Sequence, residues 1–135
     1  MPPVFVDTVA WVALVNTRDQ HHTLATEVMD ELRSQQASLV TTEFVLLEVA
    51  DALSEPMWRS KTVAFINGLR QLPILQIIPS DSILFNQGWN LYSQRPDKSW
   101  SLTDCISFAA MTQDRITTAF TSDRPFEQAG FSKLL

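Results

Sequence analysis

The chain has little cysteine, no long apolar run and little positive charge, and each shortage excludes a class of protein. Its one cysteine, Cys105, allows neither an internal disulfide nor a cysteine-cluster metal site, so a reducing, cytoplasmic location is expected. No apolar run approaches the roughly 20 residues needed to cross a bilayer, and the N-terminus lacks the features of a signal peptide. With 45% hydrophobic and 19% charged residues, the composition is that of a globular protein.

Positive charge is outweighed by negative charge. The 15 acidic residues exceed the 10 Lys and Arg residues and give a net charge of -5. Nucleic-acid binding normally leaves a basic footprint, because the protein must contact phosphates. Charge alone therefore favours a function without nucleic acid, although a cation held by carboxylates would offset part of the deficit locally.

Short apolar runs alternate with helix-like periodic segments along the 135 residues, the length of one ordinary domain. Strands are predicted at residues 4–6, 38–41, 74–78, 118–120 and 131–134, and helices at 8–15, 24–32, 43–53, 58–69, 80–92 and 104–113. This alternation, in a chain with only 3 Gly, predicts a single α/β domain, residues 1–135, around a parallel sheet.

Four acidic residues adjoin apolar runs, where a carboxylate is costly to bury without compensation. They are Asp7, Glu48, Asp104 and Asp123. Asp7 directly follows the first predicted strand, and Asp123 comes three residues after Phe120 in the fourth. Ligand sites in parallel α/β folds lie beyond the carboxyl ends of the strands, so Asp7 and Asp123 are expected at one rim.

Helix capping offers a simpler explanation for three of these acids. Asp7 and Asp123 stand where an N-cap residue would precede a helix, and Ser101 with Asp104 fits a capping box. Glu48 lies too deep in its helix to cap it, and no basic residue one turn away could pair with it. Capping therefore leaves Glu48 unexplained.

Taken together, the four acids indicate a cation. Two carboxylates about 5 Å apart repel each other by roughly 3 kcal/mol at an effective dielectric constant of 20. Four such groups would converge only at a high cost unless a cation were bound. Oxygen ligands suit Mg²⁺ or Mn²⁺, and the lack of His and Cys partners argues against zinc.

Four segments in order, 4–8, 41–48, 101–105 and 120–126, resemble the PIN-domain family, the fold of VapC-type toxin ribonucleases. The resemblance extends over nearly the whole chain, and segment 126–131 is also typical of the family. It implies a three-layer α/β/α sandwich, PIN-like, around a parallel sheet of about five strands. One departure is Val9, where many relatives have a small polar residue.

The resemblance also implies an activity, that of a metal-dependent endoribonuclease, the toxin of a toxin-antitoxin pair. By motif position, the catalytic and metal-binding residues are Asp7, Glu48, Asp104 and Asp123, with Mg²⁺ as cofactor and Mn²⁺ as a substitute. The supporting or substrate-contacting residues are Thr8, Thr121, Ser122 and Arg124. The implied partners are RNA, a second copy of the chain and a cognate antitoxin protein, with no membrane.

Two further features bear on substrate and partner. Arg95, Lys98 and Trp100 adjoin the third motif and are candidates for holding RNA, although ordinary surface or core roles explain them equally well. Segment 44–69 carries more apolar side chains than one sheet face needs, which favours a homodimer. His21 and His22 precede a helix, where exposure or capping explains them better than catalysis.

Two other functions compete with the nuclease. A non-catalytic PIN-like scaffold that binds RNA or a protein partner would suit the acidic pI of about 4.8. An aspartate-dependent phosphatase would usually carry an acid/base Asp two residues after a nucleophilic Asp7, where this chain has Val9. The scaffold remains the main alternative.

Overall fold

The computed structural model describes residues 2–135, and a parallel sheet of five strands forms its centre. The strands lie in the order β3-β2-β1-β4-β5, each parallel to its neighbours. Their bounds are β1 Val4–Val6, β2 Leu39–Thr42, β3 Leu75–Ile78, β4 Thr118–Phe120 and β5 Ser132–Lys133. β1 is fully buried, as expected for a short apolar run in the middle of a parallel sheet.

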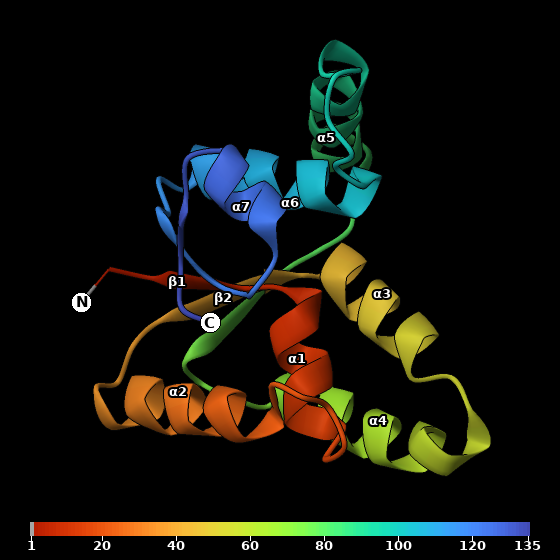
Figure 1. Ribbon diagram of the computed structural model, residues 1–135, viewed down its shortest axis with the longest axis vertical. Helices are drawn as coiled ribbons and strands as arrows, with labels where there is room; N and C mark the ends of the chain where they lie inside the picture. The colour runs from red at the N-terminus through yellow and green to blue at the C-terminus, as the bar shows by residue number, and fades with distance from the viewer. Residues whose placement is uncertain (1) are drawn as a thin grey trace.

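Helices cover both faces of this sheet. Their bounds are α1 Thr8–Val15, α2 His22–Ser34, α3 Glu43–Ala52, α4 Pro56–Leu69, α5 Ser82–Gln94, α6 Leu102–Gln113 and α7 Arg124–Gln128. Figure 1 shows α1, α2 and α4 on one side of the strands and α6 and α7 on the other, with α5 packed outside α6. This arrangement confirms the predicted three-layer α/β/α sandwich. No helix within residues 2–135 is both long and apolar enough to span a bilayer.

The order of the strands reverses at β1. From β1 the chain builds outward to β2 and β3, and it then returns to place β4 on the other side of β1. The carboxyl ends of β1 and β4 therefore meet at the switch point, where open α/β sheets bind their ligands. Val6 pairs with Phe120 in the register, so the residues that follow both strands emerge side by side.

Buried polar contacts and close packing fix the layers around this point. The Trp11 indole Nε1 donates to Thr41 Oγ1 at 3.3 Å, and the Thr41 hydroxyl donates to the Val6 carbonyl at 2.9 Å, which ties α1 and β2 to β1. On the other face, α5 approaches α6 at Gly88, where an added Cβ would lie 2.8 Å from Ile106 Cα. A side chain at position 88 would push the two helices apart.

Four helices begin at residues other than those predicted. α2 begins at His22 instead of residue 24, and local chemistry explains the shifts of the other three. α4 begins at Pro56 instead of residue 58, because proline suits the first turn of a helix. α5 begins at Ser82 instead of residue 80, because the Asp81 carboxylate accepts from the Leu84 amide at 2.7 Å. α6 begins at Leu102 because Ser101 is its cap. β5 is limited to Ser132–Lys133, within the predicted 131–134.

Candidate active site

Asp7 lies at the switch point, directly after β1, and is 2% exposed. The Thr121 hydroxyl, just beyond β4, donates to Asp7 Oδ2 at 2.9 Å. The same hydroxyl accepts from the Asp123 backbone amide at 3.0 Å. Thr121 thus joins the ends of the two strands and fixes the orientation of the Asp7 carboxylate.

The environment of Asp7 opposes its negative charge. Burial is the main cause, and together with the negative charges of Asp123 and Asp104 it raises the Asp7 pKa to about 7. The Thr121 hydroxyl and the Thr8 backbone amide act in the opposite direction. Asp7 is the N-cap residue of α1, but its carboxylate makes no side-chain capping bond, so capping alone does not account for the carboxylate. A carboxyl with a pKa near neutrality in a ligand-binding position is typical of a functional site.

Asp104 caps α6, as its sequence context suggested, and lies among the other acids. Its backbone amide donates to Ser101 Oγ at 2.9 Å and its Oδ2 accepts from the Ser101 amide at 3.1 Å, which confirms the capping box. Burial first, then the charges of Asp123 and Glu48, raise the Asp104 pKa, while the bonds to Ser101 lower it. The capping bonds hold the side chain near the other acids.

Asp123 follows β4 and is half-buried. It is the N-cap residue of α7, but its carboxylate makes no capping bond, so capping does not account for the carboxylate here either. Burial raises the Asp123 pKa and the charge of Glu48 raises it further, whereas Lys133 and His21 lower it. Lys133 also pairs with Glu127 at 2.8 Å and donates to the Ser122 carbonyl at 3.2 Å.

Glu48 completes the group from α3, where it is half-buried. Its charge raises the pKa of both Asp104 and Asp123, which places it within electrostatic reach of these two acids. All four predicted acids therefore belong to one electrostatically coupled group. Within residues 2–135, however, no three acidic, histidine or cysteine side chains lie close enough together to hold a metal ion as they stand. Repulsion between like charges opposes closer approach, and a cation bound among them would offset it.

The donor set fits a hard divalent cation. All four side chains offer carboxylate oxygens, the ligands that Mg²⁺ and Mn²⁺ prefer. Beside Asp7, the Thr8 hydroxyl is buried and has no hydrogen-bond partner among the described residues. A buried hydroxyl in this state can take a further polar ligand, such as a coordinated water or a phosphate oxygen.

Of the other predicted supporting residues, Thr121 contacts Asp7 directly, while Ser122 takes part through its backbone carbonyl. Arg124 is exposed at the start of α7. Sequence reasoning missed Lys133 and the influence of His21 on Asp123. The position of Lys133 depends on β5 pairing with β4, which sets Ala119 beside Lys133. Its place within the last predicted strand, 131–134, was the one available signal.

Comparison with known proteins gives related sequences and structures over almost the whole chain. The chain is 28% identical over 128 residues, 95% of each protein, to the 23S rRNA-specific endonuclease VapC20 of Mycobacterium tuberculosis. The crystal structure of that protein, described as a Sarcin-Ricin loop cleaving toxin, superposes with a TM-score of 0.82 over 95% of both chains.

Two more distant matches share the fold or part of the sequence. VapBC2 from Rickettsia felis, solved with a DNA fragment from its promoter, has a TM-score of 0.69 at 13% identity, covering 97% of this chain and 96% of that one. A protein of Guillardia theta named cytochrome c biogenesis protein CcsA is 29% identical over 120 residues, 87% of this chain and 36% of its own length.

A family model settles the classification that the four ordered motifs indicated. The model described as PIN domain matches residues 4–132, a range that contains β1 to β4 and all four acids. The chain therefore belongs to the PIN domain family.

Proposed function

We propose that this chain is a Mg²⁺-dependent endoribonuclease, able to use Mn²⁺ instead, which acts as the toxin of a toxin-antitoxin pair. The observation that carries the proposal is the buried Asp7 at the switch point, with its pKa raised to about 7 partly by Asp104 and Asp123. Residues 1–135 act in it as one nuclease domain. The similarity to an endonuclease named for 23S rRNA supports RNA as the substrate.

Each acid has a proposed role. Asp7, Asp104 and Asp123 are the direct metal ligands, and Glu48 binds directly or through water, because Mg²⁺ keeps several of its waters. When bound, the cation supplies an activated water and stabilises charge on the phosphate during phosphodiester hydrolysis. Thr121 orients Asp7, and the Ser101 cap holds Asp104 toward the group. The Thr8 hydroxyl, Ser122 and Arg124 have the proposed role of contacting phosphate.

Partners follow from the same proposal. A cognate antitoxin would restrain the nuclease in the cytoplasm, as the VapC resemblance implies. Exposed apolar side chains on α3 and α4 support a homodimer, since Leu47, Met57 and Val63 are all more than half exposed. A second subunit would also bring further cations toward the RNA, which an acidic chain needs.

The second candidate is a non-catalytic scaffold that binds RNA or a protein. One support is the acidic pI of about 4.8. The other is the separation of the carboxylates, because no three of them within residues 2–135 lie close enough together to hold a metal ion. The two functions differ in a measurable property, because only the nuclease requires the acids to bind a cation.

Cleavage of RNA tests the proposal. Ribosomal and transfer RNA are incubated with the purified protein in Mg²⁺, in Mn²⁺ and in EDTA, and the products are mapped by primer extension. Asp7→Asn and Asp104→Asn should abolish cleavage, whereas Asp30→Asn on the exposed face of α2 should cut like the parent. Cleavage by Asp7→Asn at the parent rate, or no Mn²⁺ binding by calorimetry at millimolar metal, would overturn the nuclease and favour the scaffold.

A further inference from the structure

Three aromatic side chains form a row on the outer face of α5. Phe85, Trp89 and Tyr92 are spaced four and three residues apart, which places them on one side of the helix. They are 40%, 49% and 45% exposed. Neighbouring rings are close to parallel, at 6° for Phe85 and Trp89 and at 19° for Trp89 and Tyr92, with centroids 6.5 and 5.6 Å apart. The row therefore presents flat aromatic surface to the solvent.

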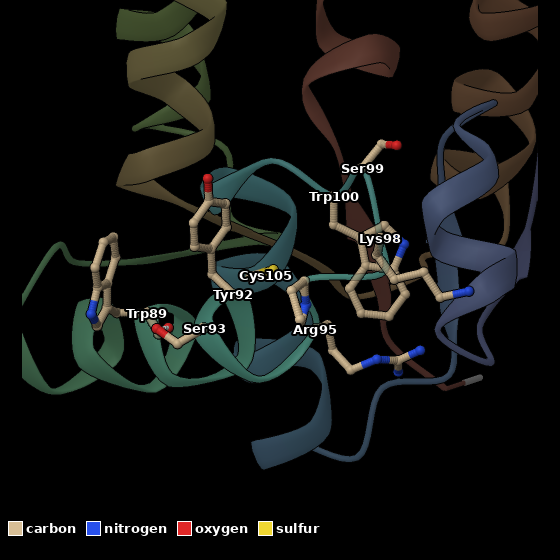
Figure 2. Close-up of a pocket in the computed structure, with 9 residues that line it drawn as sticks. Trp89, Tyr92, Ser93, Arg95, Lys98, Ser99, Trp100 and Cys105 are labelled. Atoms are coloured by element: carbon tan, nitrogen blue, oxygen red, sulfur yellow. Dashed lines mark hydrogen bonds between the residues drawn. The ribbon is translucent and has the colours of Figure 1, made fainter.

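The row leads into a cavity of about 510 Å³ between α5, the loop 95–100 and α6. Figure 2 shows Trp89 and Tyr92 on one side of this cavity, Lys98 and Trp100 on the other, and Cys105 between them. The cavity is thus walled by aromatic rings on both sides.

Two cations lie at the loop side of the cavity, and Trp100 holds them there. The Arg95 guanidinium carbon and Lys98 Nζ lie 5.0 and 5.9 Å from the centroid of the Trp100 ring, within the range of a cation-π interaction. Trp100 is 6% exposed and donates to Gln128 Oε1 at 2.8 Å, so the ring is fixed. Asp97 accepts from two of the five N–H donors of Arg95, at 3.1 Å each, and the remaining donors can bind a further acceptor.

This cavity adjoins the acid group. Trp100 and Cys105, which both line it, directly flank the segment from Ser101 to Asp104 that forms the capping box. The loop 95–100 runs directly into Ser101, the cap that holds Asp104. A polymer bound in the cavity would therefore have its next units close to the candidate metal ligands.

We propose that this cavity and the aromatic row bind single-stranded RNA beside the cleaved bond, with Trp89 and Tyr92 stacking on bases and Lys98 and Arg95 contacting phosphates. The inference rests on the proposed nuclease function and adds to it the means of holding the substrate. Exposed aromatic rings stack on any base, and nearby cations follow the backbone, which is the general pattern of single-strand recognition.

Charge complementarity favours RNA over a second protein chain on this face. The chain has only 10 basic residues and a net charge of -5, yet two of these cations flank this aromatic-walled cavity. Arg95 and Lys98 would meet phosphates favourably, while Ser93 and Ser99 at the same cavity offer hydroxyl donors. A purely apolar contact would offer no acceptor to Lys98 or to the donors of Arg95 that Asp97 leaves.

Binding can be measured without cleavage in the Asp7→Asn background. The probe is a short single-stranded RNA labelled with fluorescein, compared with a strand of the same length that lacks its bases. We expect Trp89→Ala or Tyr92→Ala to raise the Kd for RNA by roughly 5- to 150-fold, the range for loss of one stacked base. Trp89→Phe should retain most of the affinity, and Leu24→Ala, an equally exposed apolar truncation on α2, should leave it unchanged.

Two further readouts are specific to the proposed contacts. RNA should quench the tryptophan fluorescence of the Asp7→Asn protein more than that of its Trp89→Phe variant, since Trp89 is the most exposed of the four tryptophans. Trp11 and Trp100 are buried, and Trp58 is half-buried on α4 and does not line the cavity. Lys98→Gln should lower the slope of log Kd against log salt by about 0.7, the value for one phosphate contact on a single strand. Arg70→Gln, an exposed cation at the end of α4, should not change it.

Equal Kd values for the parent and Trp89→Ala, or equal affinity for RNA and the strand without bases, would overturn the inference. The inference would also be overturned if Trp89→Ala converted a dimer to a monomer in sedimentation and reduced the affinity for the RNA and for the strand without bases by the same factor. That result would assign the face to a second copy of the chain. A protein that binds RNA through Trp89 but cleaves none would sustain the inference and overturn the nuclease. RNA cleavage whose KM is unchanged by Trp89→Ala would sustain the nuclease and overturn the inference.

Discussion

Asp7 should make the metal-free protein less stable as the pH rises. The folded protein raises the Asp7 pKa from its ordinary value of 3.8 to about 7, because burial opposes the charged form. Between these two values the folded state binds more protons than the unfolded chain, so the free energy of unfolding falls with increasing pH. The full penalty is present above about pH 7 and is absent below about pH 4.

The size of this effect follows from the difference between the two pKa values. At about 1.4 kcal/mol per pH unit, Asp7 alone lowers the stability by roughly 4 kcal/mol between pH 4 and pH 7. Asp104 and Asp123 also have raised pKa values and act in the same direction. Such a loss is a large fraction of the stability of an ordinary domain.

Urea unfolding in EDTA between pH 4.5 and pH 8, followed by circular dichroism, measures the effect. Asp7→Asn removes the charge but still offers an oxygen to the Thr121 hydroxyl, so this variant should be more stable than the parent at pH 8 and should show a shallower pH dependence. Asp30→Asn, at an exposed site, should behave like the parent. Added Mg²⁺ should stabilise the parent and not Asp7→Asn. The reasoning fails if Asp7→Asn is no more stable than the parent at pH 8 and keeps its full pH dependence.

Two further predictions concern the contacts that support the site. Thr121→Val removes the donor to Asp7 and the acceptor of the Asp123 amide, so it should lower the free energy of unfolding in urea by about 1–3 kcal/mol and weaken Mn²⁺ binding in calorimetry. Thr121→Ser keeps the hydroxyl and should restore both properties. A Thr121→Val protein with the stability and Mn²⁺ affinity of the parent would contradict the role given to the hydroxyl. Gly88→Ala should lower the free energy of unfolding by about 1–3 kcal/mol, because its Cβ would lie 2.8 Å from the Ile106 backbone. Gly68→Ala has open space around it and should leave the stability unchanged or raise it by up to about 1 kcal/mol. Equal thermal midpoints for the two variants would refute the packing argument.

The sequence predicts the fold well because each strand is a short, buried apolar run with a helix after it. Val4–Val6 and Thr118–Phe120 were predicted with the bounds that the structure has, since polar residues follow both runs. The start of α5 was less accurate, because the bond between the Asp81 side chain and the Leu84 amide sets it.

The candidate site could be predicted only in part. Asp7 and Asp123 were expected at one rim because both follow parallel strands, and the register of β1 with β4 bears this out. The sequence could not decide between a cap and a site at Asp104, because one carboxylate serves the Ser101 amide and still faces its acidic neighbours. The effects of Lys133 and His21 on Asp123 arise from chain segments brought together only by folding, which no local pattern encodes.

The hydrogen bond between Thr121 and Asp7 has a consequence for the protein during its own synthesis. It joins residues 114 positions apart, and β4 must pair with β1 before it can form. A ribosome makes the N-terminal segments first, so β1, β2 and β3 emerge long before the strand that completes the site. A partly translated chain therefore carries Asp7 without Thr121 or Asp123, and the group of four acids is complete only once translation has passed β4.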